Sequence, residues 1–365
     1  MNSSPALAQV IFCGVYWLLL FVVYFYKVNI RLLRDDANRS GIAVFGLLVL
    51  LYSIFEFSGG DFYNYKLLYD NYAIFGTTSH LEPIYETFID LSPNYYIWRL
   101  IVWGIAVSIW ILVVKFLKLD SAFSSLMFIL IVFFHFVGAR QSIGFATIFL
   151  GLSFITDNSN KRFWHILVGC FLLLISILFH KTMIIYILII LVSMIPIRKR
   201  VIAVSLCVFP IVYMYFDTFI VSFLQYLGNY AEDTSNVFQR YLDSDFRSDA
   251  NIFGTLRLII ERTPVLIAVL YSMYKVFFVE NRQPYIYEVL LRASYIMIYI
   301  SFLFIGREVS AFISPRFWDA SLFPVTIFLS YYFFKIRRTS IVKVLVLMFL
   351  AAKLFLVLYN IYKFA

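Results

Sequence analysis

The 365-residue chain is 62% hydrophobic and 20% aromatic, only 14% of its residues are charged, and its mean hydropathy is +0.87. This composition excludes a soluble globular domain, in which about a quarter of the residues are charged. The net charge of +9 does not indicate nucleic-acid binding, because in a membrane protein Lys and Arg in short loops chiefly set topology. We therefore expect an integral membrane protein with no nucleic-acid partner.

The apolar residues recur in runs of a length that fits transmembrane helices rather than the strands of a membrane barrel. A helix rises 1.5 Å per residue, so roughly 20 residues cross a bilayer core of about 30 Å. The sequence predicts an all-α, polytopic protein that forms one membrane domain over residues 1–365. The first ten residues lack a basic signal region, so we expect the first run to be retained. The twelve predicted spans are 10–26, 41–57, 97–117, 121–138, 141–156, 163–180, 182–197, 201–222, 254–278, 286–305, 318–334 and 341–361.

The connections between these spans alternate between basic and non-basic. Short loops rich in Lys and Arg stay on the cytoplasmic side. If the connection after the first span faces inward, every second connection is basic, and both termini face outward. The inward groups are Lys27, Arg31, Arg34 and Arg39, then Lys115 and Lys118, then Lys161 and Arg162, then Arg198, Lys199 and Arg200, then Lys275 and Arg282, then Lys335, Arg337, Arg338 and Lys343.

The predicted outward connections are 58–96, the turn near 139–140, the break at 180–181, 223–253 and 306–317. They are either long and polar or hold isolated charges at a helix end. We therefore expect the chemistry on the outer face. A faint calcium-loop pattern in 223–253 lacks the central Gly and the closing Glu, and the three cysteines have no Cys-x-x-Cys spacing, so the sequence indicates no metal site.

The first outer connection supplies two candidate catalytic acids, Asp61 and Glu82. A group that deprotonates a sugar hydroxyl must be a carboxylate or an imidazole within hydrogen-bond reach. Asp61 follows two glycines at a helix exit, and Glu82 precedes Pro83, which favours extended backbone before a short interfacial or re-entrant helix. Solvated or helix-capping acids are the alternative. We interpret the tyrosines of this segment mainly as an interfacial aromatic belt.

Arg140 and His180 lie at breaks between apolar runs that the predicted topology places on the outer face. The planar guanidinium makes paired hydrogen bonds to phosphate and keeps its proton, so Arg140 is a candidate diphosphate ligand. An anchor that reaches toward lipid headgroups is the alternative. His180 can act as a base, an acid or a hydrogen-bond donor near neutral pH, or it can be an ordinary interface residue.

The last outer connection adds Arg307 and Arg316 as candidate diphosphate ligands, with headgroup contacts as the alternative. A further charged group, Arg257, Glu261 and Arg262, falls inside a predicted span. Arg257 and Glu261 are four residues apart and can pair on one helix face, which lowers the cost of insertion. The role of this group stays open between a structural ion pair and a substrate contact.

Several short motifs together resemble one family, the Wzy/EpsG-type polymerases of bacterial O-antigen, capsule and exopolysaccharide. The matching stretches are GGDFYNYKLLY, EPIYETFI, GARQSIGFATIFLGL, FHKTMIIYI and ISPRFWDASLFP, which follow one another in the expected order over most of the chain.

The resemblance implies a metal-independent glycosyltransferase of GT-C-like architecture that needs no cofactor. Its donor and acceptor would be undecaprenyl-pyrophosphate-linked glycans, joined at the periplasmic face of the bacterial inner membrane. By position, Arg140 and Arg316 would bind the pyrophosphate, and Asp61, Glu82 or His180 would orient or deprotonate the acceptor. Membrane lipids, a chain-length regulator and a flippase are the expected partners.

Two other functions compete with this interpretation. A lipid-linked oligosaccharide flippase would line a path through the bilayer with charge, whereas the ionisable residues here collect on one predicted face. A membrane O-acetyltransferase would need a thioester-using site, for which we find no distinct motif.

The predicted topology can be tested by thiol labelling. In an Asp61→Cys variant we expect reaction with a membrane-impermeant thiol reagent added from the periplasmic side, with the unsubstituted chain and its three native cysteines as the background control. Labelling only from the cytoplasmic side would overturn the orientation.

Overall fold

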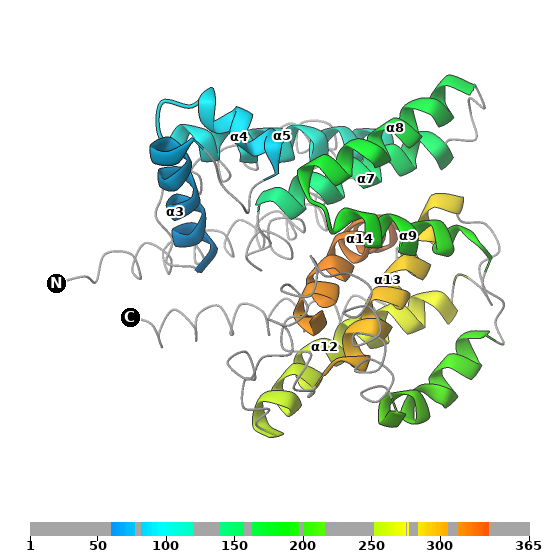
Figure 1. The fold of residues 1–365 in the computed structure, drawn as a ribbon. Helices are drawn as coiled ribbons and strands as arrows, with labels where there is room; N and C mark the ends of the chain where they lie inside the picture. Colours follow the sequence, from blue (N-terminus) through cyan, green and yellow to red (C-terminus); the bar gives the residue numbers. More distant parts are fainter. Residues whose placement is uncertain are drawn as a thin grey trace, which may run out of the picture. The chain divides into compact units, whose positions relative to one another are not determined.

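The structure, a computed structural model, contains helices and no strands within the residues it describes, which confirms the predicted all-α class. The chain divides into two compact units. The first comprises residues 1–188, 326–340 and 350–365, and the second comprises 189–325 and 341–349. The described residues are 60–76, 82–119, 139–156, 163–196, 201–215, 252–274, 276, 284–305 and 313–335 (Figure 1).

Two of the described helices are long and apolar enough to cross a membrane, α5 (Tyr95–Phe116) and α13 (Tyr285–Leu303). Both fall on predicted spans, and they support a membrane protein, whereas the count of twelve spans stays a prediction. Three shorter apolar helices also begin on predicted spans: α8 (Phe163–Phe179), α9 (Met183–Met194) and the helix Val201–Tyr215. The predicted spans 10–26, 41–57, 121–138 and 341–361 lie outside the described residues, and so does the predicted connection 223–253 except for its last two residues, which begin a helix.

The described part of the segment 58–96, which was predicted as a polar loop with one short helix, contains two complete helices before the start of α5. The expected one is α4 (Pro83–Asp90), which starts at Pro83 after the extended backbone of Glu82, with φ −73° and ψ 143°. The unexpected one is α3 (Gly60–Phe75), which ends where Gly76 takes a φ of +70° and donates its N–H to the Tyr72 carbonyl at 2.8 Å. The charged and polar residues of α3 hide its helical pattern in the sequence.

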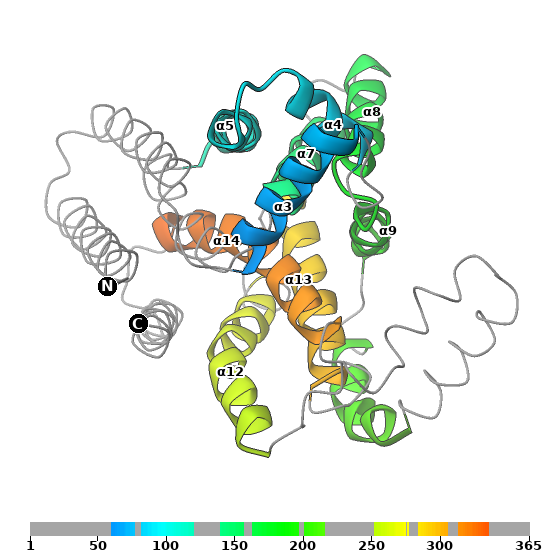
Figure 2. The ribbon, with the colours of Figure 1, turned by 60° about the vertical axis from the view of Figure 1, so that its left-hand side comes forward.

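Helices α3, α4 and α5, which are drawn in Figure 2, contact one another, and aromatic rings join them near the start of α5. Trp98 lies among the rings of Tyr69, Tyr85 and Tyr95, at centroid distances of 6.1, 6.5 and 5.7 Å, and all four side chains are buried. The Trp98 indole N–H also donates to the Tyr85 carbonyl at 3.4 Å. These tyrosines therefore form a core that fixes α4, and the interpretation as an interfacial belt does not describe them.

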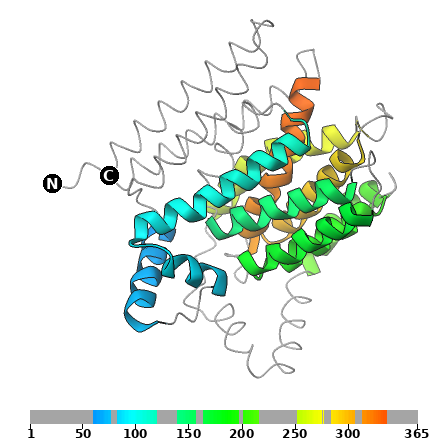
Figure 3. The same ribbon diagram turned by 90° about the horizontal axis from the view of Figure 1, so that it is seen from above.

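Helices α7 (Ala139–Thr156) and α8 lie side by side (Figure 3). Gly151 of α7 and Gly169 of α8 face each other in this contact. A Cβ placed on Gly169 would come within 2.8 Å of the Gly151 carbonyl oxygen and 2.5 Å of Ile155 Cγ1. Small residues allow helix backbones to approach closely in membrane proteins. This contact sets the start of α7 beside the end of α8.

In the second unit, side chains of α13 form hydrogen bonds to the end of α9. Arg292, which is 3% exposed, donates to the Ser193 carbonyl at 3.3 Å and pairs with Glu288 at 2.8 Å. The Tyr285 hydroxyl donates to the Met194 carbonyl at 2.5 Å. Carbonyls in the last turn of a helix have no partner within the helix, so α13 supplies donors that α9 lacks.

Two further helices of the second unit bear on the sequence predictions. Helix α12 (Ile252–Tyr274) matches the predicted span 254–278 and packs on α13. Helix α14 (Ile313–Lys335) starts five residues before the predicted span 318–334. Arg316 is therefore an exposed residue of the first turn of α14 rather than part of a loop.

The glycine contact between α7 and α8 gives a testable prediction. We expect Gly169→Ala to lower the melting temperature of the purified protein, because the added methyl group overpacks the contact at a cost of about 1–3 kcal/mol. Gly104→Ala on α5 is the matched control, since its added Cβ has no contact within 4 Å beyond its chain neighbours and the backbone of its own helix. Equal melting temperatures for the two variants would contradict the close approach of the two backbones.

Candidate functional site

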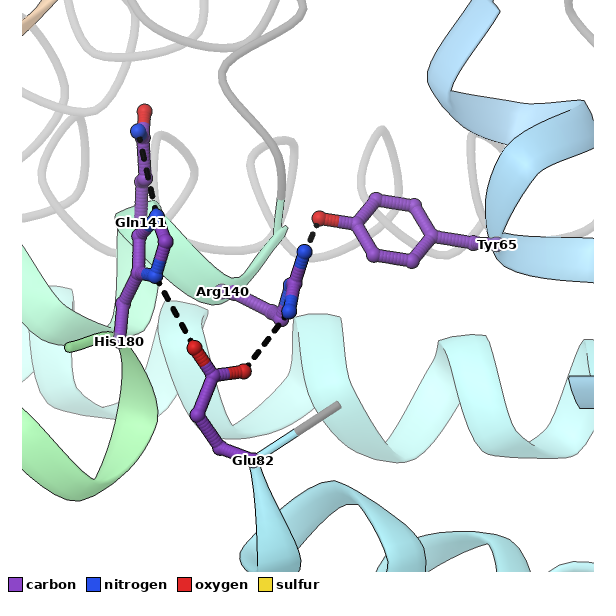
Figure 4. A network of polar contacts seen from close by, with 5 residues as sticks. All are labelled: Tyr65, Glu82, Arg140, Gln141 and His180. Atoms are coloured by element: carbon purple, nitrogen blue, oxygen red, sulfur yellow. Dashed lines mark hydrogen bonds and ion pairs between the residues drawn. The ribbon is translucent and has the colours of Figure 1, made fainter. Parts of the chain in front are cut away.

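A network of five polar side chains joins four parts of the first unit (Figure 4). Tyr65 comes from α3, Glu82 lies directly before α4, Arg140 and Gln141 occupy the first turn of α7, and His180 follows α8. The network therefore collects residues that are up to 115 positions apart in the chain, counted from Tyr65 to His180.

Glu82 is the centre of the network and is 6% exposed. One carboxylate oxygen accepts from Arg140 Nη1 at 2.7 Å, and the other contacts His180 Nδ1 at 3.1 Å. Burial alone raises the pKa of Glu82, but the hydrogen bond from His180 and the charge and hydrogen bond of Arg140 outweigh it and lower the pKa from 4.5 to about 2. Glu82 is therefore an anion throughout the neutral range.

Arg140 is held from two sides. Its Nε donates to the Tyr65 hydroxyl at 2.9 Å, its Nη1 binds Glu82, and its Cζ lies 5.1 Å from the centre of the Tyr65 ring. The sequence placed Arg140 in a turn before the helix, but the structure places it on the first turn of α7. A cation there meets the positive end of the helix dipole, so the neighbouring carboxylate offsets an unfavourable position.

His180 occupies the turn between α8 and α9. Its backbone N–H donates to the Ser176 carbonyl at 3.3 Å, and its own carbonyl accepts from Met183 N–H at 2.9 Å. A neutral imidazole that donates from Nδ1 to Glu82 carries its lone pair on Nε2. That Nε2 faces the side-chain amide nitrogen of Gln141 at 3.4 Å, a long contact in which the amide donates.

The arrangement combines a fixed cation with an oriented proton acceptor. The carboxylate of Glu82 sets the ring orientation and tautomer of His180 and would stabilise the imidazolium once a proton arrives. Glu82 itself, with its low pKa, is a poor proton acceptor at neutral pH. The side chains of Arg140 and His180 are 18% and 19% exposed, so both are partly open to solvent or substrate.

The structure brings together three of the six predicted site residues, Glu82, Arg140 and His180. Asp61 lies on α3, but its side chain is outside the described residues, and so is all of Arg307. Arg316 belongs to the second unit. Among the described residues no group of three His, Cys, Asp or Glu side chains could hold a metal ion.

Sequence reasoning missed Tyr65 and Gln141 as members of the site. Gln141 directly follows Arg140, so its presence in the same first helical turn was a usable signal. For Tyr65 there was no such signal, because nothing in the sequence distinguishes it from the other tyrosines of the segment.

The sequence matches a known protein family. The model described as the EpsG family matches residues 38–365, which include every residue of the network. No curated protein and no solved structure gives a significant match to the chain.

The low pKa of Glu82 predicts how stability depends on pH. A carboxylate whose pKa is lowered on folding stabilises the protein above its unfolded pKa, and this contribution, on the order of 3 kcal/mol, is lost as pH falls from about 4.5 toward 2. We expect Glu82→Gln to lower the melting temperature at pH 7, and the gap to wild type to narrow below pH 4. Glu86→Gln, half-buried on α4 outside the network, should keep its stability at pH 7. A constant gap from pH 7 to 3 would contradict the lowered pKa.

Proposed function

This chain belongs to the EpsG family over residues 38–365, and from this premise we propose that it is a polysaccharide polymerase. The family is associated with exopolysaccharide biosynthesis. In this proposal the protein is a metal-independent GT-C-type glycosyltransferase. It joins undecaprenyl-pyrophosphate-linked repeat units, of O-antigen or a similar glycan, at the periplasmic face of the inner membrane.

The observation that supports the proposal most is the shared carboxylate between Arg140 and His180. Glycosyl transfer from a lipid diphosphate needs a cation for the leaving group and a base for the acceptor hydroxyl, and the two must lie close together. Glu82 contacts both groups, at 2.7 and 3.1 Å, and so holds them within one small site. A flippase would have no need for such an oriented pair.

We assign roles to the three residues as follows. The acceptor hydroxyl oxygen attacks the anomeric carbon of the donor, the bond from that carbon to the diphosphate oxygen breaks, and the hydroxyl proton passes to His180 Nε2. Arg140 stabilises the negative charge that develops on the departing diphosphate. Glu82 orients His180 and stabilises its protonated form. Gln141 occupies the position facing Nε2 until the acceptor hydroxyl takes it.

The remaining members of the proposal come from the sequence. Asp61 is a further candidate for contact with the acceptor, and Arg307 and Arg316 are further candidates for the diphosphate. The partners that we propose are the lipid-linked glycan donor and acceptor, membrane lipids, a chain-length regulator and a flippase.

Arginine variants test the proposal in cells. We expect Arg140→Ala to leave membrane insertion intact and to abolish long-chain glycan, so that single repeat units accumulate on the lipid carrier. Arg140→Lys should be nearly as damaging, because lysine cannot bind Glu82, Tyr65 and a phosphate through one planar fork. Lys115→Ala, an exposed cation in the last turn of α5, is the control and should give normal glycan.

The readout is the glycan length distribution on a gel, followed by incubation of the purified protein with its lipid-linked repeat unit in the presence of a chelator. A ladder of products that disappears in the Arg140 variants supports a polymerase. Transport of the lipid-linked unit without a ladder would instead identify a flippase.

A further inference from the structure

Tyr85 is a fully buried tyrosine of α4 whose hydroxyl takes no part in the polar network. The side chain is 0% exposed, and within the described part of the chain its hydroxyl oxygen has no hydrogen-bond partner. A buried hydroxyl that makes no hydrogen bond destabilises a protein, because it has lost its bonds to water and has gained none in return. Phenylalanine would fill the same space without this cost, so the hydroxyl needs an explanation other than packing.

Tyr85 lies next to Glu82 at the start of α4. Glu82 is the residue directly before the helix, and residues three positions apart lie on the same side of a helix. The Tyr85 N–H also donates to the Glu82 carbonyl at 2.9 Å. The Tyr85 ring is 6.4 Å from the ring of Phe179, which precedes His180, and 6.5 Å from that of Trp98. Packing from two other elements therefore holds the ring beside the carboxylate.

The charges of the network act on the Tyr85 hydroxyl. Burial, together with Tyr65 and Glu82, raises its pKa well above its ordinary value, and the positive charge of Arg140 lowers the pKa by less. At neutral pH the phenol therefore keeps its proton. A protonated phenol can donate a hydrogen bond to a carboxylate.

A ligand that binds Arg140 deprives Glu82 of a partner. Arg140 Nη1 donates to one oxygen of the Glu82 carboxylate at 2.7 Å, and an anion that draws the guanidinium away breaks this bond (Figure 4). A buried carboxylate that loses its cation binds a proton more readily. The proton would go to the pair that Glu82 forms with His180, and a protonated His180 could not accept another proton from an acceptor hydroxyl.

We propose that Tyr85 is a positioning residue, whose hydroxyl donates to Glu82 in place of Arg140 when the diphosphate of a lipid-linked glycan binds Arg140. Glu82 then stays an anion, and His180 keeps both its orientation and the lone pair on Nε2. The inference rests on the proposed function and deepens it, because it supplies the exchange of partners that diphosphate binding at Arg140 requires. Tyr85 itself does not touch the substrate.

Tyr85→Phe and Tyr69→Phe form a matched pair of variants within one aromatic core. Tyr69 is also buried and also packs on Trp98, but its hydroxyl donates to the Ser92 carbonyl at 3.1 Å. In the protein without ligand we expect Tyr85→Phe to keep or raise the melting temperature, because it removes a hydroxyl that makes no hydrogen bond. Tyr69→Phe should lower the melting temperature, because it leaves a buried carbonyl without its donor.

Binding of inorganic pyrophosphate to the purified full-length protein, measured by calorimetry, tests the exchange of partners. We expect Tyr85→Phe to raise the Kd about tenfold, because it removes a hydrogen bond to a charged group that forms only in the complex. At pH 7 this variant should also take up more protons per bound pyrophosphate than wild type, as measured in two buffers of different ionisation heat. Tyr69→Phe should match wild type in both quantities, and a purely structural role of Tyr85 would change neither.

The proposal is overturned if Tyr85→Phe melts below wild type, or if either its Kd or its proton uptake equals that of wild type. An equal loss of affinity in Tyr69→Phe, or wild-type protein that binds pyrophosphate no better than Arg140→Ala does, would also overturn it. The proposed function fails on a separate measurement, which is normal glycan length in Arg140→Ala. Wild-type pyrophosphate affinity in Tyr85→Phe, with long-chain glycan lost in Arg140→Ala, removes only the role of Tyr85.

Discussion

In the described part of the first unit, the buried carboxylate of Glu82 joins Arg140 and His180 in one polar network. Its two oxygens bind the guanidinium of Arg140, on the first turn of α7, and the imidazole of His180, in the turn after α8, at 2.7 and 3.1 Å. Removing one partner of a buried ion pair is strongly destabilising, because the other charge remains buried without compensation. The geometry of Arg140 and His180 therefore depends on an anion that takes part in neither proposed bond-breaking nor proton transfer.

Two kinds of packing bring the Glu82 carboxylate close to Arg140 and His180. Aromatic rings around Trp98 fix α4, at whose start Glu82 lies, and the contact of Gly151 with Gly169 sets the start of α7 beside the end of α8. The aromatic rings fill the space around α4, whereas the two glycines have no side chains, so the backbones of α7 and α8 approach closely. The polar network joins the helix that the rings fix to the two helices that the glycines bring together. Its geometry is therefore set by apolar packing rather than by its own hydrogen bonds.

Local sequence rules predicted the features that depend on local interactions, such as where an apolar helix lies and where α4 begins. Length and hydropathy gave α5 and α8 to within two residues at each end, and Pro83 gave the start of α4. They could not give α3, whose polar residues carry no apolar period, or the choice of Tyr65 among many tyrosines. The pairing of Glu82 with both Arg140 and His180 was also out of reach, because contacts over 58 and 98 residues depend on tertiary packing.

Arg140 and Arg262 differ in the chemistry of their hydrogen-bond partners, and the difference bears on substrate selection. Arg262 of α12 binds two neutral serine hydroxyls at 2.6 Å, whereas Arg140 binds a carboxylate at 2.7 Å. A ligand that takes Arg140 must compete with an anion that is already in place. A neutral sugar hydroxyl competes poorly with a carboxylate, but a diphosphate carries more charge and more acceptor oxygens. In the proposed function, pairing with Glu82 would therefore favour the diphosphate end of a lipid-linked glycan over its sugars, and it would direct the donor so that its leaving group, rather than a hydroxyl, meets Arg140.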